Sequence, residues 1–167
     1  MALFDPHDPD MEKALHMAVR YLGIRPRSIK EMTRYLEKKK WDAHVISQVI
    51  THLKTYHYLD DDLFARLFIE NRKEQSPRSR FVLAGELKQK GISSQIITDL
   101  LSDYDDDTMA CQALAARYPR WRHLDPDARR QKAFNFLRYR GFGYDAMQSA
   151  WKTVACDRDI NRPAESG

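Results

Sequence analysis

Basic side chains are the residues of this sequence best suited to do chemistry, because they gather in three stretches of the chain. Residues 20–40 carry eight Lys or Arg against two Glu, and residues 117–140 carry eight against two Asp. Residues 72–90 carry six against two Glu. Spaced Lys and Arg suit a phosphate backbone or an acidic protein groove, since each phosphate contact releases a counterion whatever the base. The stretches therefore predict an anionic partner, with a solvated helix face as the alternative.

The basic residues of the first stretch have a helical spacing. Because Ile29, Met32 and Leu36 can turn inward together, the cations between them are left on one outer stripe. Equivalent positions recur in the other two stretches. The side chains that we predict to bind the anionic partner are Arg25, Arg27, Lys30, Arg34, Lys38, Arg72, Arg78, Arg80, Lys88, Arg129, Arg130, Lys132 and Arg138.

Catalysis, metal binding and cofactor binding find little support in the sequence. There is no GxxxxGK[ST], GxGxxG or GxSxG motif, and the six His residues lack the HExxH spacing. Cys111 and Cys156 lie 45 positions apart without a CxxC pair, which argues against a zinc or redox motif and fits a reduced cytoplasmic setting. The aspartates at 60–62 could hold a divalent cation, but helix capping explains them as well. We predict no catalytic residue, metal ligand or cofactor.

Aromatic residues interleave with the basic ones, and exposed rings could stack on unpaired bases. Core packing is the simpler interpretation for Tyr35, Phe134 and Phe142, which fall at inward-facing positions. Trp121 lies between two arginines after a proline. We therefore expect Trp121 to be the best exposed candidate for stacking.

Composition places the chain among water-soluble globular proteins. Of its 167 residues, 43% are apolar and 31% are charged. No apolar run approaches the roughly 18 residues of a membrane-spanning helix, and the acidic, Pro-containing start is unlike a secretory signal. Lys and Arg exceed Asp and Glu by 28 to 24, and the isoelectric point is about 9.1. Nucleic acid is a plausible partner, and a membrane is not.

A repeat of about 50 residues runs through the chain. The segments LEKKKW at 36–41, LKQKGI at 87–92 and LRYRGF at 137–142 share a Leu, a basic residue, a helix terminator and a large apolar residue. Around them, apolar residues recur at three- and four-residue steps rather than in alternation. Each repeat should therefore contain three short helices.

Residues typical of helix ends support this phasing. Residues 28–31 form a Ser-x-x-Glu capping box, and residues 125–126 pair an Asp N-cap with a Pro in the first helical position. Gly91 and Gly141 fall where a helix would end in a left-handed residue, which glycine adopts without strain. Lys40 holds this position in the first repeat. That helix either ends differently or accepts a strain of about 1 kcal/mol.

The predicted fold is all-α, with three tandem three-helix repeats, similar to helix-turn-helix units, in an elongated and curved array. Single repeats of this length would be marginally stable alone, so neighbours should pack in series. The predicted boundaries are a flexible acidic N-terminal tail at 1–10, repeats at 11–58, 59–104 and 105–156, and a flexible C-terminal tail at 157–167.

Several motifs, in this order and spacing, resemble the RecX family of bacterial proteins that regulate the RecA recombinase. The most specific is YLDDDLFARLFIENR at 58–72, followed by ELKQKGI at 86–92. The RPRS segment at 25–28 and FLRYRGF at 136–142 are also similar to family features. The resemblance extends over about residues 11–152.

This resemblance implies three tandem three-helix units, a cytoplasmic location and no enzymatic activity. It implies binding in the groove of the RecA–DNA nucleoprotein filament, with modulation, mainly inhibition, of RecA ATP hydrolysis and strand exchange in recombinational repair and the SOS response. The expected partners are the RecA filament and the backbone of single- and double-stranded DNA, and the protein is expected to be a monomer.

Two features depart from the family pattern. Lys40 replaces an expected Gly, and the connection at 118–126 in the third repeat is longer, which leaves the binding geometry of that repeat open.

Three-helix units with basic helices are also typical of sequence-specific helix-turn-helix transcription regulators, although no dimerisation element is evident. A nucleic-acid enzyme is a third alternative.

Overall fold

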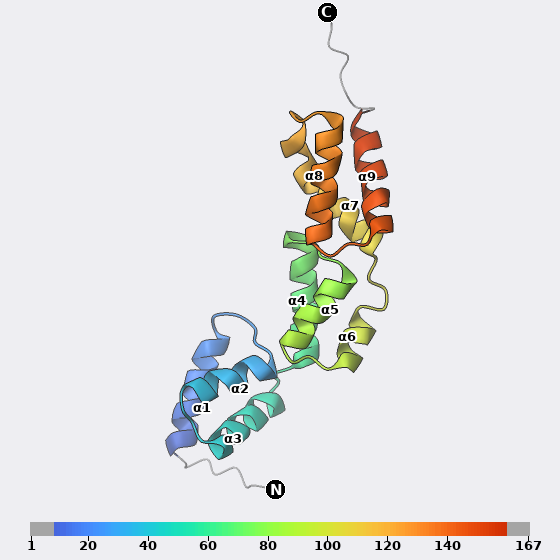
Figure 1. Ribbon diagram of the computed structural model, residues 1–167. Coiled ribbons are helices and arrows are strands. Elements are labelled where there is room, and N and C mark those ends of the chain that lie inside the picture. Colours follow the sequence, from blue (N-terminus) through green and yellow to red (C-terminus); the bar gives the residue numbers. More distant parts are fainter. Residues whose placement is uncertain (1–8, 160–167) are drawn as a thin grey trace, which may run out of the picture. The chain divides into compact units, whose positions relative to one another are not determined.

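The computed structural model describes residues 9–159, and every regular element in this range is helical (Figure 1). The predicted all-α fold is confirmed. Residues 1–8 and 160–167, which hold most of the two predicted tails, lie outside the described residues. Residues 9–10 and 157–159 are helical, so the first and last helices extend slightly beyond the predicted repeats.

The helices follow one another in groups of three. The first group is α1 (Pro9–Leu22), α2 (Ile29–Lys38) and α3 (Ala43–Thr55). The second is α4 (Asp61–Gln75), α5 (Arg80–Gln89) and α6 (Ser94–Leu100). The third is α7 (Asp106–Arg117), α8 (Pro126–Tyr139) and α9 (Tyr144–Asp159), with the short 3-10 helix η1 (Tyr118–Trp121) after α7.

Two compact units divide these helices. The first unit contains residues up to Leu67 together with Leu87–Asp99, and the second contains Phe68–Glu86 together with residues from Leu100 onward. Helices α4 and α5 therefore contribute to both units. Each unit has its own hydrophobic core.

The core of the first unit lies where α1 and α2 pack against α3. Met32 and Leu36, four residues apart on α2, are fully buried, as are Val49 and Leu53 on α3. This i, i+4 spacing places both members of each pair on one helix face. Burial of these faces removes apolar surface from water, which stabilises the fold by about 25 cal/mol for each Å² buried.

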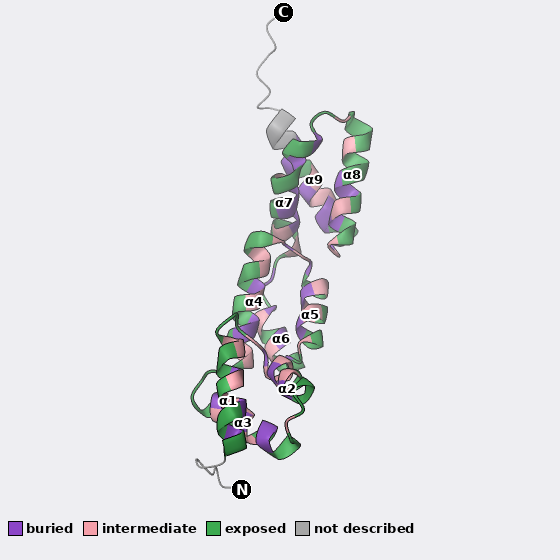
Figure 2. Cartoon of the chain, turned by 90° about the vertical axis from the view of Figure 1, so that its left-hand side faces the viewer, coloured by how far each residue is buried: buried purple, intermediate pink, exposed green. Residues whose placement is uncertain are grey.

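The core of the second unit is built mainly by α7, α8 and α9, which run side by side (Figure 1). Ala110 on α7 and Ala150 on α9 are fully buried, and such short side chains allow helices to pack closely. Buried and exposed residues alternate along α7 and α8 (Figure 2). These helices are therefore amphipathic, with the polar face left to solvent.

The equivalent leucines of the three repeats are buried as the phasing predicts. Leu36 and Leu87 in the first unit and Leu137 in the second are each 0% exposed. Phe134 and Phe142 are buried and Tyr35 is half-buried, in line with the core interpretation of these rings.

The predicted helix ends are also present. The Ser28 hydroxyl accepts from the Glu31 N–H in a complete capping box, and the Asp125 carboxylate accepts from the Ala128 N–H. Gly91 and Gly141 have φ of 87° and 85°. Lys40 has φ of 63°, so it adopts the left-handed conformation. This conformation is strained for a residue with a Cβ.

Replacing Lys40 with Gly should therefore leave the protein equally stable or stabilise it by up to about 1 kcal/mol, because glycine has no Cβ to strain at positive φ. Gly141→Ala is the matched contrast. A Cβ at Gly141 would collide with the Val82 side chain, so this variant should lose more than about 1 kcal/mol. Urea unfolding measures both changes, and a Lys40→Gly variant less stable than wild type would contradict the assignment.

Candidate nucleic-acid and protein interface

The first turn of α2 docks on residues of the second helical group within the first unit. The Ser28 hydroxyl donates to the Lys90 carbonyl oxygen at 2.7 Å, and the Ile29 N–H donates to Asp61 Oδ1 at 2.9 Å. Ser28 is fully buried. We call this set of contacts, completed by Glu31, the first joint. It satisfies backbone and side-chain groups that would otherwise be buried without partners at a helix start.

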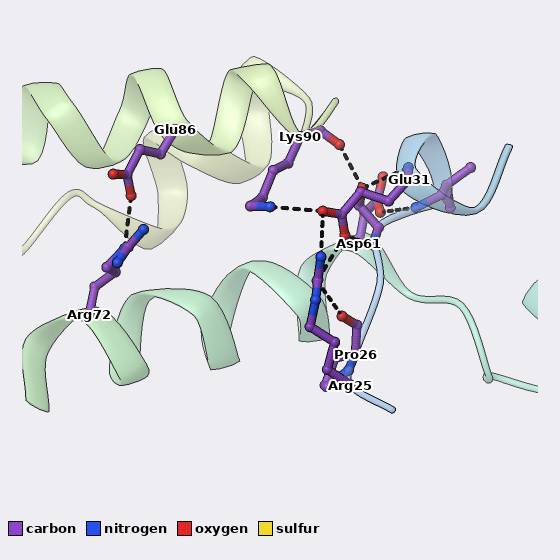
Figure 3. Close-up of polar contacts among 9 residues, drawn as sticks. Arg25, Pro26, Glu31, Asp61, Arg72, Glu86 and Lys90 are labelled. Carbon is purple, nitrogen blue, oxygen red and sulfur yellow. Dashed lines mark hydrogen bonds and ion pairs between the residues drawn. The ribbon is translucent and has the colours of Figure 1, made fainter. Parts of the chain in front are cut away.

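Glu31 is the ionic centre of the first joint (Figure 3). Its carboxylate accepts from the Arg25 guanidinium at 3.1 and 3.2 Å, from Lys90 Nζ at 2.8 Å and from the Ser28 N–H at 3.3 Å. Burial alone would raise the pKa of this carboxyl, but these hydrogen bonds outweigh burial and lower the pKa from 4.5 to about 2. Beside it, burial raises the pKa of Asp61 although the Ile29 N–H opposes the shift.

A second joint in the second unit repeats this arrangement. The Ser79 N–H donates to the Arg140 carbonyl oxygen at 3.1 Å, and the Arg80 N–H donates to Asp106 Oδ1 at 2.6 Å. The Ser79 hydroxyl accepts from the Val82 N–H at 3.3 Å. In the second joint, Val82 occupies the position that Glu31 holds in the first. Val82 has no side-chain acceptor, so the Ser79 N–H donates instead to the Arg140 carbonyl oxygen in the following repeat.

Replacing Glu31 with Gln should destabilise the protein by about 1 kcal/mol at pH 7, the scale of a partly exposed ion pair. The depressed pKa stabilises the folded state above pH 4.5, and this contribution is lost as pH falls toward about 2. The difference in the free energy of unfolding between wild type and Glu31→Gln should therefore shrink as pH falls from 4.5 to about 2, as measured by urea unfolding.

The matched control is Glu37→Gln, at an exposed carboxylate of the same helix with no ion pair among the described residues. It should leave the free energy of unfolding nearly unchanged. If the difference in the free energy of unfolding between wild type and Glu31→Gln stayed constant from pH 7 to about 2, the ionic role of Glu31 would be contradicted.

Several predicted binding residues serve the fold. Arg25 pairs with Glu31, and the Arg72 Nε lies 2.9 Å from Glu86 Oε2 (Figure 3). Arg80 donates to the carbonyl oxygens of residues 102 and 104, and Arg129 donates to those of residues 122 and 124. These guanidiniums hold loops together, a role that spacing in the sequence does not reveal.

Other predicted residues are half-buried beside apolar groups. The Arg27 guanidinium carbon lies 3.8 Å from the centre of the Tyr21 ring, which stacks on Tyr35 at 4.0 Å. The Lys30 stem lies so close to Gly91 that a Cβ there would approach it to 2.6 Å. Arg78 lies near the Tyr139 ring.

The remaining predicted residues are exposed on the three middle helices. None of them has a carboxylate within ion-pair distance among the described residues. This exposed basic set consists of Arg34 and Lys38 on α2, Lys88 on α5, and Arg130, Lys132 and Arg138 on α8. Such unpaired cations are the ones able to contact phosphate or carboxylate groups of a partner.

The prediction that Trp121 is exposed is wrong. It is 8% exposed, because η1 turns its ring inward against Phe136 at 5.5 Å, edge to face. The rings that the structure exposes in this unit are Phe81, Tyr139 and Tyr144. Tyr139 and Tyr144 are among the aromatics that interleave with basic residues in the sequence, but spacing did not single them out and did not indicate Phe81, although the two arginines that flank Tyr139 were a usable signal.

The aspartates at 60–62 act as helix caps and in ion pairs. Asp60 accepts from the N–H groups of residues 62 and 63, Asp61 belongs to the first joint, and Asp62 pairs with Arg66 at 2.6 Å. Among the residues that the structure describes, no three acidic, His or Cys side chains gather as a metal site. In the same range no helix combines the length and apolar character that crossing a membrane requires.

The fold and its joints define a class of tandem repeat proteins in which three-helix units follow one another and expose basic middle helices. Models of the three successive three-helix domains of RecX match residues 14–53, 60–101 and 105–151. The chain therefore belongs to the RecX family.

Curated relatives and a solved structure agree with this assignment. The chain is 36% identical over 135 residues to the regulatory protein RecX of Chlorobium phaeobacteroides. The aligned residues cover 81% of this chain and 89% of that protein. It is 33% identical over 147 residues to that of Pelodictyon phaeoclathratiforme, covering 88% and 92%. The crystal structure of RecX from Lactobacillus salivarius superposes with a TM-score of 0.71 at 23% identity, covering 88% of this chain and 97% of that one, which supports the fold.

Proposed function

We propose that this protein binds the RecA–DNA nucleoprotein filament and inhibits ATP hydrolysis and strand exchange by RecA. It acts as a cytoplasmic monomer, without catalysis of its own, in recombinational repair and the SOS response. The observation that carries the proposal is the match of three consecutive domains to the RecX family. Relatives from several bacteria bear the name regulatory protein RecX.

The exposed basic set supports the contact with DNA. Its six members lie on α2, α5 and α8, one middle helix from each group. Each phosphate contact is weak and independent of sequence, but contacts on one chain add through effective concentration. A protein bound to both the DNA backbone and neighbouring recombinase subunits would couple those subunits and so alter nucleotide turnover.

The direct experiment compares binding to naked DNA with binding to single strands coated by RecA, by fluorescence anisotropy at fixed salt. A filament regulator binds the coated strand more tightly and slows ATP hydrolysis by RecA. Equal affinity for both, with no effect on hydrolysis, would contradict the proposal. Preference for one naked duplex sequence would instead favour a sequence-specific transcription regulator.

Two charge-removal variants should lose this inhibition while remaining folded. One combines Arg34→Ala with Lys38→Ala on α2, and the other replaces Arg130, Lys132 and Arg138 with Ala on α8. Exposed single charges change stability by less than about 0.5 kcal/mol, whereas each lost phosphate contact lowers the slope of log affinity against log salt by about 0.7 on single strands. The measurements are ATP hydrolysis by RecA and the salt dependence of binding.

The control combines Lys13→Ala with Lys54→Ala, which removes two exposed charges from α1 and α3 instead of from a middle helix. It should inhibit like wild type. If the two middle-helix variants also inhibit like wild type, with unchanged circular dichroism, the exposed basic set is only a solvated face.

A further inference from the structure

Three arginines of the second unit lie near one another without a carboxylate. Arg78 precedes α5, Arg117 ends α7 and Arg140 caps the C-terminus of α8; together we call them the arginine cluster. Burial lowers the pKa of the Arg140 guanidinium, and the charges of Arg78 and Arg117 lower it further. In the described part of the chain, none of the three has a carboxylate within 4.0 Å. Within the described part of the chain, no carboxylate therefore forms an ion pair with these three arginines.

Neutral groups hold Arg140, the centre of the arginine cluster, in place. Arg140 Nη1 donates to the Ser76 hydroxyl at 3.0 Å, and the guanidinium carbon lies 4.4 Å from the centre of the Phe136 ring. The Nε atoms of Arg78 and Arg140 are buried without a hydrogen-bond partner among the described residues. By contrast, Arg72 in the same unit has Glu86 at 2.9 Å. A fixed, unpaired set of guanidiniums suits a multivalent anion such as phosphate.

Two strongly exposed rings flank the same place. Phe81 and Tyr139 are each 83% exposed, and the Arg78 guanidinium carbon lies 5.9 Å from the centre of the Tyr139 ring. Phe81 stands in the first turn of α5, next to Val82, whose side chain touches Gly141 at the end of α8. Phe81 lies two residues after Ser79, and Tyr139 immediately precedes Arg140, whose carbonyl oxygen accepts from the Ser79 N–H, so both residues border the second joint with exposed rings.

We propose that the arginine cluster binds a phosphate of a single DNA strand while Tyr139 and Phe81 stack on neighbouring bases. Every unpaired base offers a flat face, so such stacking is independent of sequence. An acidic peptide would pair with the arginines but leave the two rings without a role. The inference rests on the proposed function only for the identity of the strand, because binding here requires no recombinase.

The test is fluorescence anisotropy with a labelled oligothymidylate of about 20 nucleotides, without recombinase. Tyr139→Ala and Phe81→Ala should each weaken binding about fivefold or more, the loss expected for one stacked base. Tyr139→Phe should keep wild-type affinity, since the ring is retained. Tyr56→Ala, at an exposed ring of the first unit, is the matched control and should bind like wild type.

An abasic strand of the same length separates stacking from charge. It keeps the phosphates but offers no base to either ring, so wild type should bind it more weakly than Tyr139→Ala or Phe81→Ala binds oligothymidylate, and both ring variants should bind it as wild type does. Arg117→Ala changes an exposed side chain and should weaken binding to both strands. It should also lower the salt slope by about 0.7.

Unchanged oligothymidylate affinity in Tyr139→Ala and Phe81→Ala, with wild-type circular dichroism, would overturn the proposal. Polyglutamate that competes as well as DNA, with the ring variants unaffected, would assign the cluster to an acidic protein and would overturn it too. Failure to inhibit ATP hydrolysis by RecA contradicts the proposed function, whereas oligothymidylate binding decides this inference alone.

Discussion

The structure depends on one recurring interaction, in which the first N–H group of a middle helix donates to an aspartate of the next helical group. Ile29 donates to Asp61 in the first unit, and Arg80 donates to Asp106 in the second. A helix start leaves backbone donors without intrahelical partners, and burial of such donors is costly. The starts of α2 and α5 are therefore completed by the following helical group, which favours short repeats in tandem.

This requirement divides the basic residues into two kinds. Residues near the joints and loops are committed to carboxylates or carbonyl oxygens, as for Arg25 and Arg129. Residues farther along the middle helices, such as Arg34 and Lys132, remain exposed and unpaired in the described part of the chain. A high local density of positive charge therefore has two causes, and the cations committed to the joints and loops are not available to a partner. The arginine cluster is a third case, since it is partly buried yet lacks a carboxylate.

Local signals predicted the helices well and the long-range contacts poorly. The spacing of Leu36 and the Ser28 capping box act within a few residues, so periodicity and cap chemistry were sufficient. The hydrogen bond from Ser28 to Lys90 joins residues 62 positions apart, which no local pattern encodes. Trp121 was misjudged for the same reason, because its burial depends on Phe136 in another helix. Thus helix positions could be predicted, but which cations are free could not.

Amide hydrogen exchange tests the joints most directly, because it reports on single backbone donors under native conditions. First-turn amides of a helix exchange quickly when they have no acceptor. Slow exchange is expected for Ile29 and Arg80, whose N–H groups bond to aspartates, and fast exchange for Asp127 in the first turn of α8, whose N–H has no acceptor in another helical group among the described residues. Equally fast exchange at all three amides would show that the joints do not hold, and would contradict this account of the fold.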